Sequence, residues 1–580
     1  MDNTTFGYIE RFSFSQPLPA LIFLSVFLAA ISYCSVSAQA SPQSDSVPWV
    51  GLQNEWFQIT RAHLRDARKG KEYLKEGYEK YNKKGKAFKS PVLAQKELII
   101  LPPAAIHWLL RQSEDRVSQP KVLSRLIQAK YFLPALPPGE VVHTTLIKAD
   151  LNRHLASLTT AIVSEIRISL ARHWGTDTSN WHRVNVLHTI KDISAAVSTR
   201  VFFGAALAHD PSFLSHTDSF SSLMMASSGI LTFFVPAALR PILGPVFALP
   251  ARYHAWRMNA KLIPLIEQRI AQLSSSSSSS PFPPTNSNSD VLTHHIATAI
   301  TSSSSSSPAD SSPARIAARL QAILGFAAIP TTSMTLANAL LTLAALPSSS
   351  PSSSSPSSSP STDSPASSPS PSALLALRAE AESVLSAHAG TWTRDSLREL
   401  VRADSFIKET MRLYPFAGRG LLHEVVADDG VVLPAGLGPD GADADRIVLP
   451  KGAWLGVPVG EIQTDEEVYG EGAKRFEAWR FVGERTEREG EGASSGKGSS
   501  VTTTSDTFLS FSRGKHVCPG RFFAANVMKL VLAHVAMEYD IKPLAKRPEN
   551  VLYSDISAPP DKAEIEVRRR RKEGPGEALV

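Results

Sequence analysis

Segments with helical spacing of apolar residues dominate this chain of 580 residues. In each segment the apolar side chains recur every three or four positions, which places them on one face of a helix. This pattern predicts helices over the ranges 55–86, 104–112, 155–173, 183–203, 316–346, 404–414 and 522–542. Three short apolar stretches predict strands, at 98–101, 454–457 and 565–568. We therefore expect a mainly α-helical fold with a smaller β-sheet region.

Serine- and proline-rich tracts interrupt this pattern. Such a composition cannot bury a core, so we predict disordered inserts between helices rather than domain boundaries. These tracts lie near 274–289, 302–312 and 347–372, and an insert rich in Gly, Ser and Glu lies near 483–505. The interpretation is one large domain over 48–572, which follows an N-terminal segment (1–16) and an apolar segment (17–40) and precedes a tail (573–580).

The apolar segment 17–40 is long enough to span a bilayer, which needs about 20 residues. Basic residues gather after it, whereas Arg11 is the only one before it, and this asymmetry predicts a single-pass anchor with the main domain in the cytosol. A cleaved signal peptide is the alternative, because Ala38-Gln39-Ala40 resembles a cleavage site. The two cysteines, Cys34 and Cys518, leave no disulfide within the main domain, which favours the anchor.

Composition and charge exclude two classes of function. The net charge of +6 is weak for this length, and the basic residues are scattered, so binding to nucleic acid has little support. Two cysteines are too few for zinc clusters of cysteine and histidine. The hydrophobic fraction of 43% is that of an ordinary globular protein.

One cysteine lies in a short loop directly before an apolar helical pattern. The loop, residues 511–520, has the sequence Phe-Ser-Arg-Gly-Lys-His-Val-Cys-Pro-Gly. The start of a helix favours an anion, so we expect Cys518 to be a thiolate, which is either a nucleophile or a metal ligand. No aspartate or glutamate within the loop would assist a nucleophile, whereas Arg513, Lys515 and His516 would suit an anionic partner.

The glycines of the loop indicate what that partner is. Gly514 and Gly520 leave room for a flat group against the backbone, and Phe511 can shield the sulfur from water. A flat, anionic group that carries iron is haem, for which a cysteine thiolate is a known axial ligand. A structural cysteine in a basic turn is the alternative.

This loop resembles the signature Phe-x-x-Gly-x-(Arg/His)-x-Cys-x-Gly of the cytochrome P450 family. The resemblance implies haem b (iron protoporphyrin IX) as the cofactor, with Cys518 as the axial ligand of its iron. It also implies that further residues of the loop surround the cofactor: Phe511, Arg513, Gly514, His516 and Gly520.

The long apolar segment 316–346 is similar to the distal helix of the same family. Its residues Ala327-Ala328-Ile329-Pro330-Thr331-Thr332 match the motif (Ala/Gly)-Gly-x-(Asp/Glu)-Thr-Thr. The resemblance implies that Thr331 is the threonine that helps deliver protons during oxygen activation. Pro330 departs from the motif, because many members carry an acid there, and it leaves water or Thr332 as substitutes. A kinked core helix is the alternative.

Glu409 and Arg412 lie on one face of the predicted helix 404–414. By themselves they are typical of an exposed ion pair, which contributes little to the stability of the fold. They also match the Glu-x-x-Arg pair of the family, whose third member would be Arg480. The resemblance implies that the three residues support the haem-binding core and take no part in the chemistry.

The resemblance covers about 49–570 apart from the inserts, and it is nearest to fungal members of specialised metabolism, including relatives of ent-kaurene oxidase. It implies the cytochrome P450 fold, with haem between the long distal helix and the proximal cysteine loop. It further implies a monooxygenase of the endoplasmic reticulum membrane that acts on an apolar small molecule such as a terpenoid. Substrate contacts are implied around 130–133, 233–234, 326–329, 415–422 and 554–559.

The implied electron donor is NADPH, through NADPH–cytochrome P450 reductase, with cytochrome b5 as a further candidate partner. Two other functions stay open. One is a haem-thiolate isomerase or peroxygenase-like enzyme, which Pro330 favours, and the other is a decayed homologue that binds haem without turnover.

Overall fold

The computed structural model describes residues 47–56, 58–92, 95–136, 146–233, 235, 239–275, 290–301, 312–346, 372–438, 447–483 and 500–571. The predicted anchor, Cys34, the C-terminal tail and most of each predicted insert lie outside the described residues. The chain forms two compact units. The first unit comprises Met1–Pro134, Leu223–Pro250 and Leu421–Val457, and the second comprises Ala135–Ser222, Ala251–Gly420 and Pro458–Val580.

A five-stranded sheet organises the first unit. Its strands lie in the order β1 (Phe88–Val92), β2 (Gln95–Ile100), β8 (Trp454–Pro458), β5 (Arg419–Val425) and β3 (Val117–Ser118). Strands β1 and β2 are antiparallel, and β2 runs parallel to β8 with Leu98 opposite Trp454. Helix α3 (Gln58–Lys80) packs on β1 at Gly77, where an added Cβ would lie 2.3 Å from the ring of the buried Phe88. Only glycine allows this close approach.

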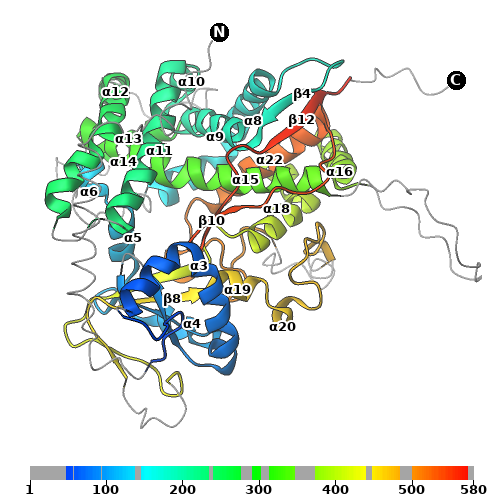
Figure 1. Ribbon diagram of the computed structural model, residues 1–580. Helices are drawn as coiled ribbons and strands as arrows, with labels where there is room; N and C mark the ends of the chain where they lie inside the picture. The colour runs from blue at the N-terminus through cyan, green and yellow to red at the C-terminus, as the bar shows by residue number, and fades with distance from the viewer. Residues whose placement is uncertain are drawn as a thin grey trace, which may run out of the picture. The chain divides into compact units, whose positions relative to one another are not determined.

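Helices make up most of the second unit (Figure 1). The principal ones are α8 (Asn152–Trp174), α9 (Val186–Phe203), α13 (Val291–Thr301), α14 (Pro313–Ala322), α15 (Ile329–Ala345), α16 (Ala373–Ala387), α18 (Val401–Leu413) and α22 (Arg521–Glu538). Helix α15 packs against α9, α18 and α22, which makes it the central helix of this unit. Helices α11 (Pro211–Phe233) and α12 (Arg240–Ser275) contribute residues to both units.

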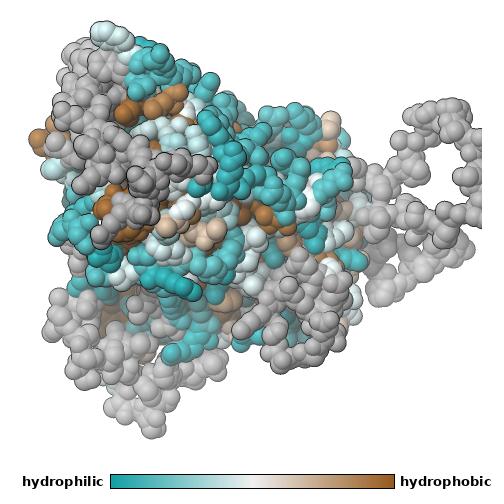
Figure 2. Space-filling view, turned by 90° about the horizontal axis from the view of Figure 1, so that it is seen from below, coloured by the Kyte–Doolittle hydropathy of each residue, from teal (hydrophilic) through white to brown (hydrophobic). Residues whose placement is uncertain are grey.

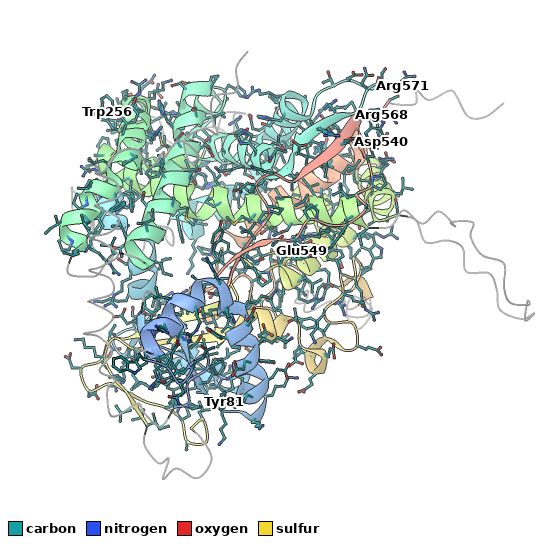
Figure 3. All side chains as sticks on the ribbon, viewed as in Figure 1. Tyr81, Trp256, Asp540, Glu549, Arg568 and Arg571 are labelled. Atoms are coloured by element: carbon teal, nitrogen blue, oxygen red, sulfur yellow. The ribbon has the colours of Figure 1, made fainter. Side chains whose placement is uncertain are left out.

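Two small sheets complete the second unit. One has the order β4 (His182–Asn185), β12 (Glu564–Arg569) and β9 (Tyr539–Ile541), and the other is the hairpin of β10 (Val551–Tyr553) and β11 (Ile556–Ala558). Asp540 on β9 and Arg568 on β12 form an ion pair of 3.3 Å between neighbouring strands (Figure 3).

The predicted helix 316–346 is confirmed, and it contains a wider turn. Helix α14 continues through a π-helical segment, Ile323–Ala328, into α15. Pro330 has no N–H to donate to the preceding turn, so the helical hydrogen bonding must change just before it. The hydroxyl of Ser221 on α11 donates to the carbonyl oxygen of Gly325 in this segment (2.8 Å). Of the described helices, Pro313–Ala345 alone is long and apolar enough to cross a membrane, but two-thirds of its apolar part is buried in the protein, as expected of a core helix.

The other predicted elements agree with the structure apart from their ends. The three predicted strands lie in β2, β8 and β12, and the predicted helix 404–414 corresponds to α18. The mainly α-helical fold class is therefore confirmed. Three apolar side chains of α12, those of Ile242, Val246 and Leu249, are exposed. On the face of the molecule in Figure 2, apolar residues form separate patches among hydrophilic ones.

Candidate active site

The cysteine loop is a tight turn that precedes helix α22. The N–H of Cys518 donates to the carbonyl oxygen of Phe511 (2.8 Å), which closes the loop. Two residues in the left-handed region, Ser512 (φ 62°) and Gly514 (φ 72°), turn the backbone. Gly514 begins a single 3₁₀ turn, and α22 begins at Arg521. The backbone conformation therefore favours glycine at position 514, because other residues rarely adopt a positive φ.

The sulfur of Cys518 is held by backbone donors. It accepts hydrogen bonds from the N–H groups of Gly520 and Arg521. Burial nevertheless raises the pKa of the Cys518 thiol, and it outweighs these donors and the charge of Arg521. The expectation that the start of the helix alone makes this cysteine a thiolate is therefore wrong. A metal cation bound to the sulfur would reverse the balance, because a coordinating thiol loses its proton.

The charges around the loop also differ from the prediction. The Nε of Arg513 lies 2.6 Å from Oδ1 of Asp506, and its Nη1 donates to the carbonyl oxygen of Thr504 (2.9 Å). The loop itself lacks an acid, as the sequence indicates, but Asp506 just before it supplies one. Within the loop, Lys515 is exposed and His516 is half-buried.

A glycine leaves room beside the sulfur, and an asparagine from another helix holds the loop in place. An added Cβ at Gly520 would meet no atom within 4 Å, so the space on that side of the loop is open. Phe511 is buried. The side-chain amide of Asn152, the first residue of α8, donates to the carbonyl oxygen of Pro519 (3.0 Å). Helix α8 therefore fixes the loop directly after Cys518.

The central helix of the second unit carries an open stripe of small residues. Thr331 is exposed, and Ala327 and Thr335, four residues to either side, are half-buried. The hydroxyl of Thr331 donates to the carbonyl oxygen of Ala327 (2.5 Å), and that of Thr335 donates to the carbonyl oxygen of Thr331 (3.0 Å). Thr332 and Pro330 are buried. The two adjacent threonines thus lie in different environments, and only Thr331 faces open space.

These features fit the binding of a flat group through sulfur. Backbone N–H groups stabilise a thiolate at Cys518, Gly520 leaves the space beside it open, and the stripe at Thr331 offers a helix surface without bulky side chains. The donor set suits haem iron, for which thiolate is an axial ligand.

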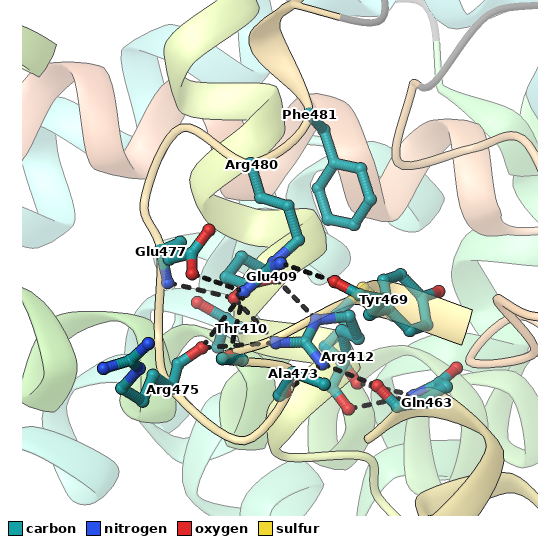
Figure 4. Close-up of polar contacts among 12 residues, drawn as sticks. Glu409, Thr410, Arg412, Gln463, Tyr469, Ala473, Arg475, Glu477, Arg480 and Phe481 are labelled. Carbon is teal, nitrogen blue, oxygen red and sulfur yellow. Dashed lines mark hydrogen bonds and ion pairs between the residues drawn. The ribbon is translucent and has the colours of Figure 1, made fainter. Parts of the chain in front are cut away.

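A buried cluster of charged groups surrounds Glu409 (Figure 4). Arg412 donates from Nε and Nη2 to the two carboxylate oxygens of Glu409 (2.7 and 2.8 Å), and both side chains are 0% exposed. The Nε of Arg480 and the N–H of Glu477 also donate to Oε1 of Glu409 (3.2 and 3.0 Å). The alternative of an exposed helical ion pair is therefore wrong.

The same cluster connects α18 to the chain before, within and after α20 (Glu466–Tyr469). Nη1 of Arg412 donates to the carbonyl oxygens of Gln463 (2.6 Å) and Ala473 (2.5 Å). Arg480 donates to the carbonyl oxygens of Tyr469 (3.3 Å) and Gly472 (3.2 Å). Arginine is suited to this task, because its planar fork can satisfy several oxygens at once.

Gln463 is a residue whose importance the sequence did not reveal. Its Oε1 accepts from the N–H of Leu509 (2.8 Å) and the hydroxyl of Ser510 (3.0 Å). Its Nε2 donates to the carbonyl oxygens of Met411 (3.3 Å) and Arg412 (3.1 Å). Gln463 is fully buried and joins α18 to the segment that leads into the cysteine loop.

Comparison with known proteins agrees with this architecture. A family model described as Cytochrome P450 matches residues 57–350 and 369–567. The chain is 30% identical over 532 residues to cytochrome P450 monooxygenase gloP of Glarea lozoyensis, with 91% of each chain covered. It is 30% identical over 556 residues to cytochrome P450 monooxygenase polB of Polytolypa hystricis, with 95% of this chain and 98% of the relative covered. It is also 27% identical over 570 residues to cytochrome P450 monooxygenase fsoD of Humicola fuscoatra.

The chain therefore belongs to the cytochrome P450 family. This confirms the predicted family, fold class and enzyme class, that of a cytochrome P450 monooxygenase. The family is one of haem enzymes, and the relatives named above come from fungi.

Proposed function

We propose that this chain is a haem-thiolate monooxygenase. It inserts one oxygen atom of O2 into an apolar small molecule, and the other atom leaves as water with electrons from an NADPH-dependent reductase. The observation that carries the proposal is the environment of Cys518, whose sulfur accepts two backbone N–H groups beside open space at Gly520. When bound there, haem supplies the iron at which O2 is activated.

In this proposal the loop residues hold the cofactor. Cys518 is the axial ligand, and the N–H groups of Gly520 and Arg521 stabilise its negative charge. The buried Phe511 keeps water from the sulfur. Arg513, Gly514 and His516 complete the cofactor-binding loop, although Asp506 already offsets the charge of Arg513. Glu409 and Arg412 on α18, together with Arg480, support the core that holds this loop.

We assign proton delivery to Thr331 rather than to Thr332. The Oγ1 of Thr331 lies on the open stripe of α15, where it can exchange its hydrogen bond to Ala327 for one to water. Thr332 is buried and has no such access. Pro330 supplies no acid, so the proton must reach Thr331 from solvent rather than from a neighbouring carboxyl group.

The substrate we propose is an apolar specialised metabolite, with terpenoids as the leading class. The similarity to fungal cytochrome P450 monooxygenases supports a monooxygenase reaction, and the terpenoid class rests on the resemblance to relatives of ent-kaurene oxidase. NADPH–cytochrome P450 reductase is the proposed electron donor, with cytochrome b5 as a second partner. The apolar segment 17–40 supports a single-pass anchor in the endoplasmic reticulum membrane with the catalytic domain in the cytosol.

A peroxygenase-like or isomerase reaction is the second candidate, and Pro330 is the observation that favours it. An enzyme of that kind needs no electrons from NADPH. A requirement for reductase and NADPH during turnover therefore separates the two candidates.

The proposal is tested with the reduced, carbon-monoxide-bound protein in microsomes. The unmodified chain should show the strongly red-shifted Soret band of thiolate-ligated haem, and Cys518→Ser should lose it. Thr331→Ala should keep the band but release more hydrogen peroxide per NADPH consumed, because proton delivery then fails. The matched control is Thr335→Ala, which removes a hydroxyl from the same stripe. An unchanged peroxide ratio in Thr331→Ala would refute the role of Thr331.

A further inference from the structure

Two segments of the second unit that are far apart in sequence are joined edge to edge. One follows α18 and comprises 415–420, and the other is the hairpin β10–β11. The N–H of Gly418 donates to the carbonyl oxygen of Asp555 (2.8 Å), and the N–H of Ser557 donates to that of Phe416 (3.1 Å). Ala417 and Ile556 form an antiparallel bridge between them.

A nearly buried ion pair fastens the tip of the hairpin to the first segment. Asp555 accepts from Nη1 of Arg419 at Oδ1 (2.6 Å) and from the backbone N–H of Arg419 at Oδ2 (2.7 Å). The side chains of Arg419 and Asp555 are 4% and 11% exposed. Arg419 also donates to the hydroxyl of Ser554, which turns the hairpin with a φ of 57°. Removing one partner of such a pair leaves the other charge buried without compensation, so the loss of either partner should loosen this contact.

The base of the hairpin is held against the central helix. Arg547 donates to Oδ1 of Asn338 (2.6 Å) and Oγ1 of Thr342 (3.0 Å), both on α15. It also donates to Oδ1 of Asn550 (2.9 Å), directly before β10. Asn338 lies seven residues along the same helix from Thr331, or about 10 Å at 1.5 Å per residue. The hairpin is thus fixed to the helix that carries the open stripe at Thr331.

The two joined segments expose apolar side chains. Phe416 of the first segment and Val551, Leu552 and Tyr553 of β10 are all exposed. All three side chains of β10 are apolar or aromatic, and none is buried. Exposed apolar groups on a rigid support are typical of a surface that receives an apolar ligand.

We propose that Arg419 and Asp555 form a positioning pair, which fixes the hairpin β10–β11 against 415–420 and so sets the shape of the apolar surface that receives the substrate. This inference rests on the proposed function, because the ligand is the apolar substrate of the haem enzyme. Neither side chain touches the reacting atoms, and both act through Phe416 and β10.

The test uses the full chain loaded with haem and two azole probes. Imidazole needs only the iron, whereas clotrimazole also needs the shaped apolar surface, and both shift the Soret band on binding. In Asp555→Asn, which keeps the shape but removes the charge, the Kd of clotrimazole should rise by at least about fivefold while that of imidazole stays within about twofold. Arg419→Met should have the same effect, and the double variant should add little to either.

Two further variants keep the test independent of folding. Arg419→Lys retains the positive charge and should recover part of the clotrimazole affinity. The matched control is Glu549→Gln, which breaks the ion pair of Glu549 (labelled in Figure 3) with Lys546 on the chain leading to the same hairpin. These two side chains are 82% and 80% exposed, so neither azole should respond.

The outcomes separate this inference from the function on which it rests. Suppose that Asp555→Asn keeps the red-shifted Soret band. If the Kd values of both azoles then rise equally, or neither changes, the positioning role alone is overturned. The absence of that band from the unmodified protein would overturn the proposed function, and this inference with it.

Discussion

Gln463 shows how a single uncharged side chain can hold a catalytic loop in place. Its amide makes four buried hydrogen bonds, two to α18 and two to residues that lead into the cysteine loop. Gln463→Leu keeps the volume but removes the partner of the Leu509 N–H and of the Arg412 carbonyl oxygen, whereas the hydroxyl of Ser510 still donates to the carbonyl oxygen of Met411 (3.1 Å). At 1–3 kcal/mol for each buried unsatisfied group, we expect a loss of about 3–5 kcal/mol in the free energy of unfolding. Chemical denaturation followed by circular dichroism measures this loss.

The graded control for this prediction is Gln463→His. An imidazole has one donor and one acceptor nitrogen, so it can keep part of the bridge between α18 and the loop. Its loss should be clearly smaller than that of Gln463→Leu. Equal losses would mean that the amide contributes through its volume and not through its hydrogen bonds.

At the scale of residues, the sequence predicted those site residues that belong to compact signatures. The loop around Cys518 and the pair Glu409 and Arg412 each occupy a few adjacent positions, so their spacing is visible without a fold. Gln463 and Asp555 have ordinary local sequences, and their partners come from other segments. Asp506 meets Arg513 only because the chain turns between them. Nothing in a linear pattern distinguishes such residues from solvated ones. The pKa of Cys518 was misjudged for a related reason, because burial depends on the whole fold.

At the scale of elements, Glu538 joins the end of α22 to strand β12. Its carboxylate lies 2.8 Å from Nδ1 of His534 and 2.8 Å from Nη2 of Arg569 on β12. Burial alone would raise the pKa of Glu538, but the hydrogen bond from His534 and the charge of Arg569 outweigh it and lower the pKa below its usual 4.5. A lowered pKa means that the contact stabilises the fold above pH 4.5 and that this stability is lost as the pH falls through the folded-state value.

Glu538→Gln should therefore lower the free energy of unfolding by about 2 kcal/mol at pH 7, the usual range for hydrogen bonds to a charged group. The difference from the unmodified protein should shrink as the pH falls below 4.5. Denaturation midpoints at a series of pH values measure it. Glu549→Gln is the control, because that ion pair is exposed and should show almost no effect. A difference for Glu538→Gln that grows towards low pH would contradict the assigned sign.

The type of each long element could be predicted, but its partners could not. Helical periodicity located α15 and α18 because burial of one face repeats along the chain. The pairing of β2 with β8 unites residues such as Leu98 and Trp454, which no local pattern connects. The sequence offered a kinked core helix around Pro330 as one interpretation, but it did not show that Ser221 would satisfy a carbonyl oxygen in the wider turn before this proline.

At the scale of the whole molecule, the family match itself is divided. It ends at residue 350 and resumes at 369, so the Ser/Pro-rich stretch between these positions has no counterpart in the family model. Helix α15 ends at Ala345 and α16 begins at Ala373, capped by the hydroxyl of Ser372, which accepts from the N–H of Leu375 (3.4 Å). Removing 351–368 leaves this cap in place and leaves enough chain to span about 25 Å.

Deletion of 351–368 should therefore leave the haem spectrum and the denaturation midpoint unchanged, because a Ser/Pro-rich composition cannot bury a core and the entropy of loop closure changes only slowly with loop length. The matched variant Ser372→Ala, a single substitution, should cost about 1 kcal/mol by loss of the helix cap. The single substitution should therefore destabilise the protein more than the deletion does. If the deletion lowered the midpoint more than Ser372→Ala does, the tract would be part of the folded core, and the interpretation of one domain interrupted by inserts would fail.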